Sequence, residues 1–279
     1  MEFRVTGLDG KVVVVTGGAR GMGAAYVRAF LAEGSKVVAA DLSWDAVAAF
    51  RDEVAATGGL PLVMDITDDR AVDAAFAAVI ARFGAVDVLV NNAGMRQRYL
   101  YPPHGRVTTL ETADEDWERM FAVNVFGTLK VTRRFMQPML ERQRGSIITV
   151  CSSGILAHSR GGGYTALRPN SREMPYMASK AALATLCFYL ADEVKDRNVA
   201  VNSILPGHTR TTGSDEQTRV RATMGVTGAP KMLVPEHVVP LVLYLASKDA
   251  SQVTGKLFDA VQCNIAHGLG GRERWEAPE

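Results

Sequence analysis

The sequence has few of the residues that build disulfide frameworks and metal centres. It holds 3 cysteines and 5 histidines in 279 residues, and they form no CxxC, HExxH or HxxxH pair. An odd, scattered set of cysteines argues against a disulfide-stapled fold, and unpaired histidines argue against a helical metal site. No GxSxG is present either, which disfavours a serine hydrolase. We therefore expect neither a structural disulfide nor a metal.

An excess of charge of either sign is also missing. Lys and Arg total 31 and Asp and Glu total 30, so the net charge is +1, and no overall field favours nucleic acid or an anionic membrane. The start lacks an apolar signal core, and no apolar run reaches the length of a membrane span. With the scattered cysteines, these absences predict a cytoplasmic protein without nucleic-acid or membrane partners.

What is present is an ordinary globular composition, with 47 % apolar and 22 % charged residues. Short apolar runs alternate with segments of helical periodicity. The runs predict strands at Val12–Val15, Lys36–Ala40, Leu60–Met64, Val86–Val90, Ser146–Val150, Val199–Leu205 and Lys256–Val261. Uninterrupted apolar strands are typical of a parallel sheet covered on both faces. We therefore predict an α/β fold, a Rossmann-like doubly wound parallel sheet with helices on both faces.

Helices are predicted between these strands. The first carries Met22, Tyr26 and Phe30 on one face, Ser43 is a candidate N-cap of the second, and Val72 to Phe83 stripe the third before Gly84. Thr112 and Glu115 predict a capping box before a long helix around Trp117–Leu140, and further helices are expected at Tyr176–Asp196 and Pro235–Ala246. No repeat or linker divides the chain, so we predict a single domain over residues 1–279.

A glycine-rich turn, Thr16-Gly17-Gly18-Ala19-Arg20-Gly21-Met22-Gly23, joins the first strand to the first helix. Glycine allows a tight turn and the close approach of a pyrophosphate, whose charge meets the unpaired N–H groups of the helix. The placement of the turn predicts a nucleotide site, although the spacing is not the GxGxxG of most dinucleotide folds.

Several motifs in order resemble those of the short-chain dehydrogenase/reductase family over nearly the whole chain. Besides the glycine turn they are Asn91-Asn92-Ala93-Gly94 after the fourth strand, Asn124, Ser152 after the fifth strand, Tyr176-Met177-Ala178-Ser179-Lys180 as YxxxK, and Pro206-Gly207 after the sixth strand. The resemblance implies an oxidoreductase that interconverts a secondary alcohol and a ketone with a nicotinamide cofactor. It also implies a homotetramer.

The chemistry of the YxxxK motif can be argued from the residues. Tyr176 and Lys180 are four apart and share one face of a helix. Free tyrosine has a pKa near 10, so a base near neutrality needs positive charge that favours the phenolate, here the ammonium and an oxidised nicotinamide ring. Tyr176 is thus predicted to be the general acid/base. By the resemblance, Ser152 would hold the substrate oxygen and Asn124 would help position a water beside Lys180.

Two neighbouring residues compete with Ser152. Ser153 is a second hydroxyl, but successive side chains of a strand point to opposite faces, so only one fits the role. Cys151 offers a thiol, but no histidine is paired with it locally, and a buried structural thiol is the better interpretation. We assign the catalytic position to Ser152.

The remaining cofactor contacts follow from the resemblance. It implies that Gly17, Arg20, Gly21, Met22, Gly23, Asp41, Leu42, Asp65, Ile66, Asn92, Ala93, Gly94, Tyr176, Lys180, Pro206, Gly207, Thr209 and Thr211 bind the dinucleotide. In this set Asp65 would contact the adenine edge, and Thr209 stands where the family usually has an apolar residue.

Asp41, at the end of the second strand, predicts NAD rather than NADP. A carboxylate there accepts hydrogen bonds from the adenosine ribose, whereas a 2′-phosphate would meet like charge at a cost of about 4 kcal/mol at 4 Å. Arg20 in the glycine turn argues the other way, but an exposed arginine pair returns only about 1 kcal/mol. Leu42 adds no positive charge.

Two segments are longer than compact members of the family need, at about 95–112 and 157–175, and both leave strand ends on the cofactor side. Their aromatic residues Tyr99, Tyr101 and Tyr164 predict a lid over a bulky, cyclic or aromatic alcohol, with the tail at about 264–279 as further cover. A competing interpretation is that Arg96, Arg98, Arg160 or Arg168 grips a substrate carboxylate or phosphate; ordinary variation of surface loops is a third.

Three alternatives to this function stay open at this point. One is an NADP-dependent carbonyl reductase of the same family. Another is a non-catalytic NAD(P)-binding regulator, which would be expected to lack the tyrosine, lysine or serine. The third, a sugar-nucleotide epimerase or dehydratase, usually carries a larger C-terminal substrate domain.

Overall fold

The computed structural model describes residues 5–96, 109–156, 174–211, 214–215 and 231–278. Seven parallel strands form one sheet in the order β3-β2-β1-β4-β5-β6-β7. They are β1 Val12–Thr16, β2 Lys36–Asp41, β3 Leu60–Val63, β4 Val88–Asn91, β5 Gly145–Val150, β6 Val199–Leu205 and β7 Leu257–Asp259. The predicted doubly wound α/β sheet is confirmed.

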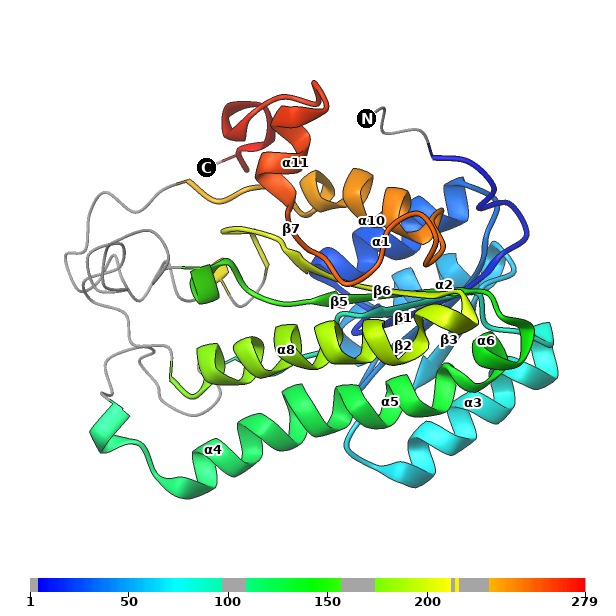
Figure 1. The fold of residues 1–279 in the computed structure, drawn as a ribbon, viewed down its shortest axis with the longest axis horizontal. Coiled ribbons are helices and arrows are strands. Elements are labelled where there is room, and N and C mark those ends of the chain that lie inside the picture. The colour runs from blue at the N-terminus through cyan, green and yellow to red at the C-terminus, as the bar shows by residue number, and fades with distance from the viewer. Residues whose placement is uncertain (1–4, 97–108, 157–173, 212–213, 216–230, 279) are drawn as a thin grey trace.

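Helices cover both faces of this sheet (Figure 1). The longer ones are α1 Gly21–Ala32, α2 Ala48–Ala56, α3 Asp69–Phe83, α4 Asp114–Phe121, α5 Thr128–Phe135, α6 Gln137–Arg142, α8 Tyr176–Val194, α10 Val239–Ala246 and α11 Ala260–Ala266. In Figure 1, α1 and α10 lie on one face of the sheet, and α3, α5 and α8 lie on the other.

The alternation of side chains along β1 explains the two faces. Val13 and Val15 pack in a core cluster with residues of α1 and α10, while Val12 and Val14 pack in a second cluster with residues of α3, α5 and α8. Because every residue of β1 is buried on one face or the other, the strand is apolar from Val12 to Val15.

Three local predictions were wrong. The capping box does not form, because the N-cap of α4 is Ala113, and Thr112 Oγ1 instead donates to Thr109 O and accepts from Trp117 Nε1. Ser43 Oγ accepts from Asp45 N before a short 3-10 turn, and α2 begins only at Ala48. The last strand stops at Asp259, whose carboxylate caps α11 through the N–H groups of Val261 and Gln262.

The long helix expected around Trp117–Leu140 is divided into α4, α5 and α6. A π-helical segment at Ala122–Gly127 joins the first two, and Pro138 lies in the first turn of α6. Single π-helical turns are often found at functional sites, and this one contains Asn124.

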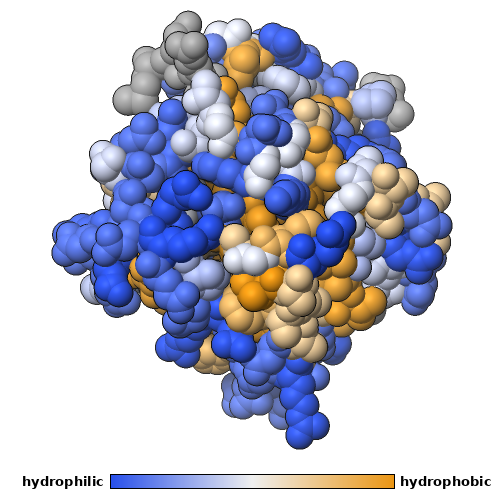
Figure 2. Space-filling model, turned by 90° about the vertical axis from the view of Figure 1, so that its right-hand side faces the viewer, coloured by the Kyte–Doolittle hydropathy of each residue, from blue (hydrophilic) through white to orange (hydrophobic). Residues whose placement is uncertain are grey.

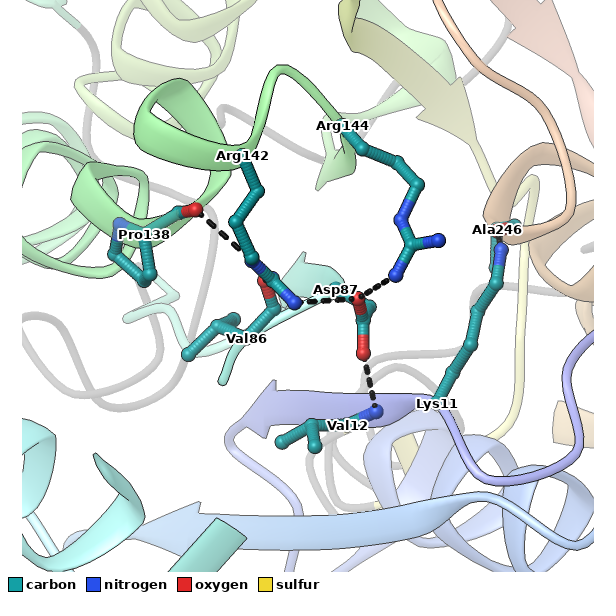
Figure 3. A network of polar contacts seen from close by, with 8 residues as sticks. All are labelled: Lys11, Val12, Val86, Asp87, Pro138, Arg142, Arg144 and Ala246. Carbon is teal, nitrogen blue, oxygen red and sulfur yellow. Dashed lines mark hydrogen bonds and ion pairs between the residues drawn. The ribbon is translucent and has the colours of Figure 1, made fainter. Parts of the chain in front are cut away.

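A buried carboxylate ties the amino ends of the central strands together (Figure 3). Asp87 accepts from Val12 N at 2.9 Å and forms ion pairs with Arg142 at 3.2 Å and Arg144 at 3.3 Å. The amino ends of the strands lie at the right of Figure 1, and Figure 2 views the molecule from that side, where hydrophilic groups surround apolar areas. The network therefore holds the end of the sheet opposite to the strand ends that carry the predicted motifs.

Candidate active site

A groove of about 1010 Å³ runs along the carboxyl ends of the strands, where a doubly wound sheet binds its ligands. Of the predicted site residues, it is lined by Gly17, Arg20, Gly21, Met22, Asp41, Leu42, Asp65, Ile66, Asn92, Ala93, Gly94, Ser152, Tyr176, Lys180, Pro206, Gly207, Thr209 and Thr211. Gly23 and Asn124 lie behind this surface. The structure thus brings the predicted residues to one site, while their individual roles stay predictions.

The glycine turn needs its glycines for steric reasons. Gly17 has a φ of +63°, and a Cβ on it would lie 2.9 Å from Ala93 Cα. A Cβ on Gly23 would collide with the carbonyl oxygen of Gly17. At the start of α1, Arg20 supplies no side-chain cap, so the first N–H groups of the helix can meet an anion in the groove. The turn fits a pyrophosphate.

Asp41 is fixed at the edge of that turn. One of its carboxylate oxygens accepts from Ala19 N at 3.0 Å, and the other accepts from Leu42 N at 2.8 Å. These bonds hold the carboxylate against the glycine turn and along the groove. Arg20 is exposed and lines the same part of the groove.

Asp65 makes a local turn at the end of β3. Its Oδ1 accepts from both the backbone N and the hydroxyl of Thr67 at 2.8 Å, which leaves Oδ2 for a ligand. Ile66 is buried, and Gly127 of the π-helical segment packs so closely on it that a Cβ there would lie 2.9 Å from Ile66 Cγ1. This contact fixes the floor of the groove at that end.

The Asn91-Asn92-Ala93-Gly94 segment is bound to β1. Asn92 Nδ2 donates to the carbonyl oxygens of Thr16 and Gly17, both at 3.0 Å, and Thr16 Oγ1 accepts from the N–H groups of Asn92 and Ala93. The segment therefore supports the glycine turn from the neighbouring strand.

Lys180 is buried beneath the other end of the groove. Only 4 % of it is exposed, and its Nζ donates to Val150 O at 2.9 Å. The same Nζ lies 5.8 Å from the ring centre of the half-buried Tyr176. The helical spacing thus places a cation next to the predicted acid/base, as the chemistry requires.

Asn124 holds the residues around this lysine. Its Oδ1 accepts from Met95 N at 2.7 Å, and its Nδ2 donates to Met95 O and to Ser179 Oγ. A Cβ on Gly94 would lie 3.2 Å from Asn124 Oδ1 and 3.4 Å from Lys180 Nζ. The oxygen and the nitrogen of the asparagine side chain are thus both bonded to the protein around Lys180.

The structure separates the two candidate serines. Ser153 Oγ accepts from Gly207 N at 2.9 Å, so this hydroxyl supports the Pro206-Gly207 turn. Ser152 is half-buried and lines the groove. Cys151 is 2 % exposed, and burial raises the pKa of its thiol to about 12, so it is a poor nucleophile near neutrality.

Past β6, the backbone of Pro206-Gly207 turns along the groove with a φ of +75° at Gly207. Thr209, which departs from the family pattern, uses its hydroxyl to donate to Pro206 O at 3.0 Å. Thr211 N donates to Ser214 Oγ at 2.6 Å. The unusual threonine thus stabilises the turn itself.

Sequence reasoning missed one wall of the groove. Arg119, Ala122 and Val123 line it from α4 and the π-helical segment. Their i, i+3, i+4 spacing places them on one helical face. This spacing, just before Asn124 in the sequence, could have predicted the wall. Arg96, named only among the loop arginines, also lines the groove, and its guanidinium carbon lies 5.4 Å from the ring centre of Tyr176.

Most of the predicted lid lies outside the described residues, including Arg98, Tyr99, Tyr101, His104, Arg160, Gly161 to Gly163, Tyr164 and Arg168. The tail is described to residue 278. It packs along residues 231–234 through Val234 N to Trp275 O and Ala277 N to Met232 O, both 2.8 Å. None of its described residues lines the groove.

No helix in the described part of the chain is long and apolar enough to span a membrane. No group of three or more His, Cys, Asp or Glu side chains there is placed to hold a metal ion.

A parallel sheet with a glycine turn and a Tyr–Lys pair at its carboxyl edge is the arrangement of a dinucleotide-dependent oxidoreductase. The family model of short chain dehydrogenases matches residues 11–222. The chain belongs to this family. It is therefore an oxidoreductase, and it uses an NAD(P) cofactor as the family does.

Curated relatives support the same family. The chain is 51 % identical to the fluoren-9-ol dehydrogenase of Terrabacter sp. (strain DBF63) over 271 residues, which is 97 % of this chain and 76 % of the relative. It is 35 % identical to a 3-alpha-(or 20-beta)-hydroxysteroid dehydrogenase of Mycobacterium bovis, over 90 % of this chain and 88 % of the relative. The crystal structure of gox2181 matches with a TM-score of 0.74 at 25 % identity, covering 94 % of this chain and 97 % of that one.

Proposed function

We propose that this protein is an NAD-dependent dehydrogenase that interconverts a bulky, cyclic or aromatic secondary alcohol and its ketone. The observation that carries the proposal is that one groove joins two sets of residues. Asp41 and the glycine turn line one part of it, and Ser152, Tyr176 and Lys180 line another. A dinucleotide lying along the groove brings its nicotinamide to the catalytic group.

The residues fit such a cofactor. The glycine turn and Asp41 line the part of the groove where a pyrophosphate and the adenosine ribose would lie, and Asp65 lines the same groove beyond β3. When bound, the nicotinamide supplies the hydride acceptor in oxidation and the hydride donor in reduction.

The residues of the chain move and hold the proton. Tyr176 accepts the hydroxyl proton of the alcohol, or donates one to the carbonyl oxygen in reverse. The Lys180 ammonium, held by Val150 O, favours the phenolate. Ser152 holds the substrate oxygen by a hydrogen bond, and Asn124 keeps Met95 and Ser179 in place around the lysine.

The preference for NAD rests on Asp41. Its carboxylate is tied to Ala19 N and Leu42 N, so it cannot easily turn away from a 2′-phosphate. Arg20 is the feature that favours NADP, but its exposure screens any ion pair that it makes.

The substrate class is supported by the relatives. The names of two of them, a fluoren-9-ol dehydrogenase and a hydroxysteroid dehydrogenase, give fused-ring alcohols as substrates. A groove of about 1010 Å³ is large enough for a dinucleotide with a ligand of that kind beside it.

The function is tested by measuring the absorbance of reduced nicotinamide with fluorenol, steroid, monocyclic and short-chain secondary alcohols, each with NAD and with NADP. We expect the highest kcat/KM with a fused-ring alcohol and NAD. Higher efficiency with NADP would indicate the carbonyl-reductase alternative. Cofactor binding without turnover of any alcohol or ketone would indicate the regulator.

Two further properties belong to the proposal. Phe126 on the π-helical segment and Phe188 and Tyr189 on α8 are exposed aromatic residues, which supports a homo-oligomer, a tetramer by the family resemblance. Light scattering on the purified protein measures this directly.

The three cysteines are free, which supports a reducing, cytoplasmic setting.

A further inference from the structure

His237 is a buried titratable residue that the mechanism above does not use. It lies in the 3-10 turn Pro235–Val238 that leads into α10, and its exposed fraction is 0 %. It does not line the groove, but it contacts the turn that does. Pro206, Gly207, His208 and Thr209 form that turn and one wall of the groove, and we call it the Pro206 wall.

Both ring nitrogens of His237 face backbone carbonyl oxygens. Nδ1 lies 2.7 Å from Val234 O, and Nε2 lies 2.5 Å from Pro206 O. A carbonyl oxygen only accepts hydrogen bonds, and a neutral imidazole donates from one nitrogen. Either nitrogen can carry that proton, and the tautomer protonated at Nε2 donates to the Pro206 carbonyl.

The backbone of His237 is held by α11. Asn264 of α11 is 1 % exposed, and its Nδ2 donates to His237 O at 2.8 Å. On the other side, Thr209 Oγ1 is a second donor to Pro206 O at 3.0 Å. His237 therefore links α11, through its backbone oxygen, to the wall of the groove, through its side chain.

We propose that His237 is a positioning residue, which holds the Pro206 wall through its Nε2–H bond and so sets the affinity for the nicotinamide cofactor. The inference rests on the proposed function, because the wall matters only if it borders the bound cofactor. Loss of this bond frees the Pro206 carbonyl on one side and lets the turn move, although no group that touches substrate is altered.

Two substitutions separate the two ring nitrogens. In His237→Gln the side-chain amide nitrogen takes the place of Nε2 and keeps a donor for Pro206 O. In His237→Asn it takes the place of Nδ1 and keeps a donor only for Val234 O. Both remove the ring and leave a polar amide in the same pocket, so a merely structural role predicts similar losses for the two.

The experiment measures the dissociation constant of NADH by fluorescence for the wild type and both variants, with the melting temperature of each. We expect His237→Gln to bind within about twofold of the wild type and His237→Asn to bind about tenfold more weakly, the worth of one hydrogen bond. With saturating cofactor, kcat should change by no more than about twofold in either variant, because the bond acts on the wall rather than on the proton transfer.

Equal NADH affinities in the two variants would overturn the inference while the proposed function stands. A wild type that binds neither NADH nor NADPH would overturn both. If the histidine variants do not fold, Asn264→Leu removes the hydrogen bond that holds the His237 backbone, at a position that does not line the groove. It is expected to weaken NADH binding several-fold, and an unchanged affinity would count against the inference.

Discussion

The guanidinium of Arg96 lies 5.4 Å from the ring centre of Tyr176, on a different element from Lys180, whose ammonium lies 5.8 Å from the same ring. Two cations thus flank the proposed acid/base. A cation within about 6 Å of an aromatic ring is attracted to its face, so Arg96 holds the ring and places a second positive charge beside it.

Replacing Arg96 with methionine keeps an unbranched side chain and removes the charge. We expect kcat/KM for the alcohol to fall about 3- to 10-fold, with the dissociation constant of NADH changed little. Arg133→Met, at an exposed position on α5, is the matched control and should behave as the wild type. A substrate with a carboxylate that loses much more than a neutral alcohol would instead support the anion-binding interpretation of Arg96.

Tyr176→Phe keeps the ring and removes the oxygen that carries the proton. Turnover should fall at least about 100-fold, and NADH should still bind because the glycine turn and Asp41 are unchanged. Steady-state rates and a fluorescence titration check the two parts. Near-normal turnover in this variant would rule out the proposed mechanism.

Asp41→Asn tests cofactor choice with little change in shape. The asparagine oxygen still accepts from Ala19 N, but the charge that opposes a 2′-phosphate is gone. We expect the ratio of kcat/KM for NAD over NADP to fall at least about tenfold. The reason is that two like charges about 4 Å apart cost on the order of 4 kcal/mol. An unchanged ratio would show that another group reads the ribose.

The Asp87 network contributes to stability and not to activity (Figure 3). Asp87→Ala leaves the buried Val12 N–H without its acceptor and two arginines without their partner. The free energy of unfolding should fall by about 2–4 kcal/mol, while the surviving folded protein keeps its kcat. Asp52→Ala breaks an exposed ion pair with Arg51. It should change the free energy of unfolding by less than about 0.5 kcal/mol. Urea denaturation of both variants measures the difference.

His237 makes stability depend on pH. Burial lowers the pKa of His237 below its ordinary value near 6.5, against two carbonyl contacts that raise it. The unfolded chain therefore takes up this proton first as the pH falls, and the stabilisation from the neutral ring, present above about pH 6.5, is lost toward the lower pKa of the folded state. Unfolding free energies at about pH 5 to 8 should decline less steeply toward acid in His237→Gln than in the wild type. Parallel declines would show that other groups dominate.

The features that sequence predicts well here are those that depend on neighbouring residues. Apolar runs such as Val12–Val15 predicted the strands because both faces of the sheet are covered. The four-residue spacing of Tyr176 and Lys180 predicted their shared helical face, and the glycines predicted the tight turn between β1 and α1.

What escaped prediction depends on contacts between distant segments. Thr112 does not cap α4, because its hydroxyl accepts from Trp117 Nε1. The hydroxyl of Ser153 accepts from Gly207 N, 54 residues later, and Ser153 does not line the groove. No local pattern marks the π-helical turn at Asn124, which is bound to Met95 of another loop. The contact of His237 with the groove wall likewise depends on Pro206, which lies 31 residues away in the sequence.

The strand order reverses direction at one place, between β1 and β4. The chain before β4 supplies the glycine turn, Asp41 and Asp65, and the chain after it supplies Ser152, Tyr176 and Lys180. Under the proposed function, a recombinant enzyme joined within β4 to another member of the family would take its cofactor preference from one parent and its alcohol specificity from the other. The proposed determinants of the two specificities thus lie on opposite sides of one crossover point, where gene shuffling would separate them.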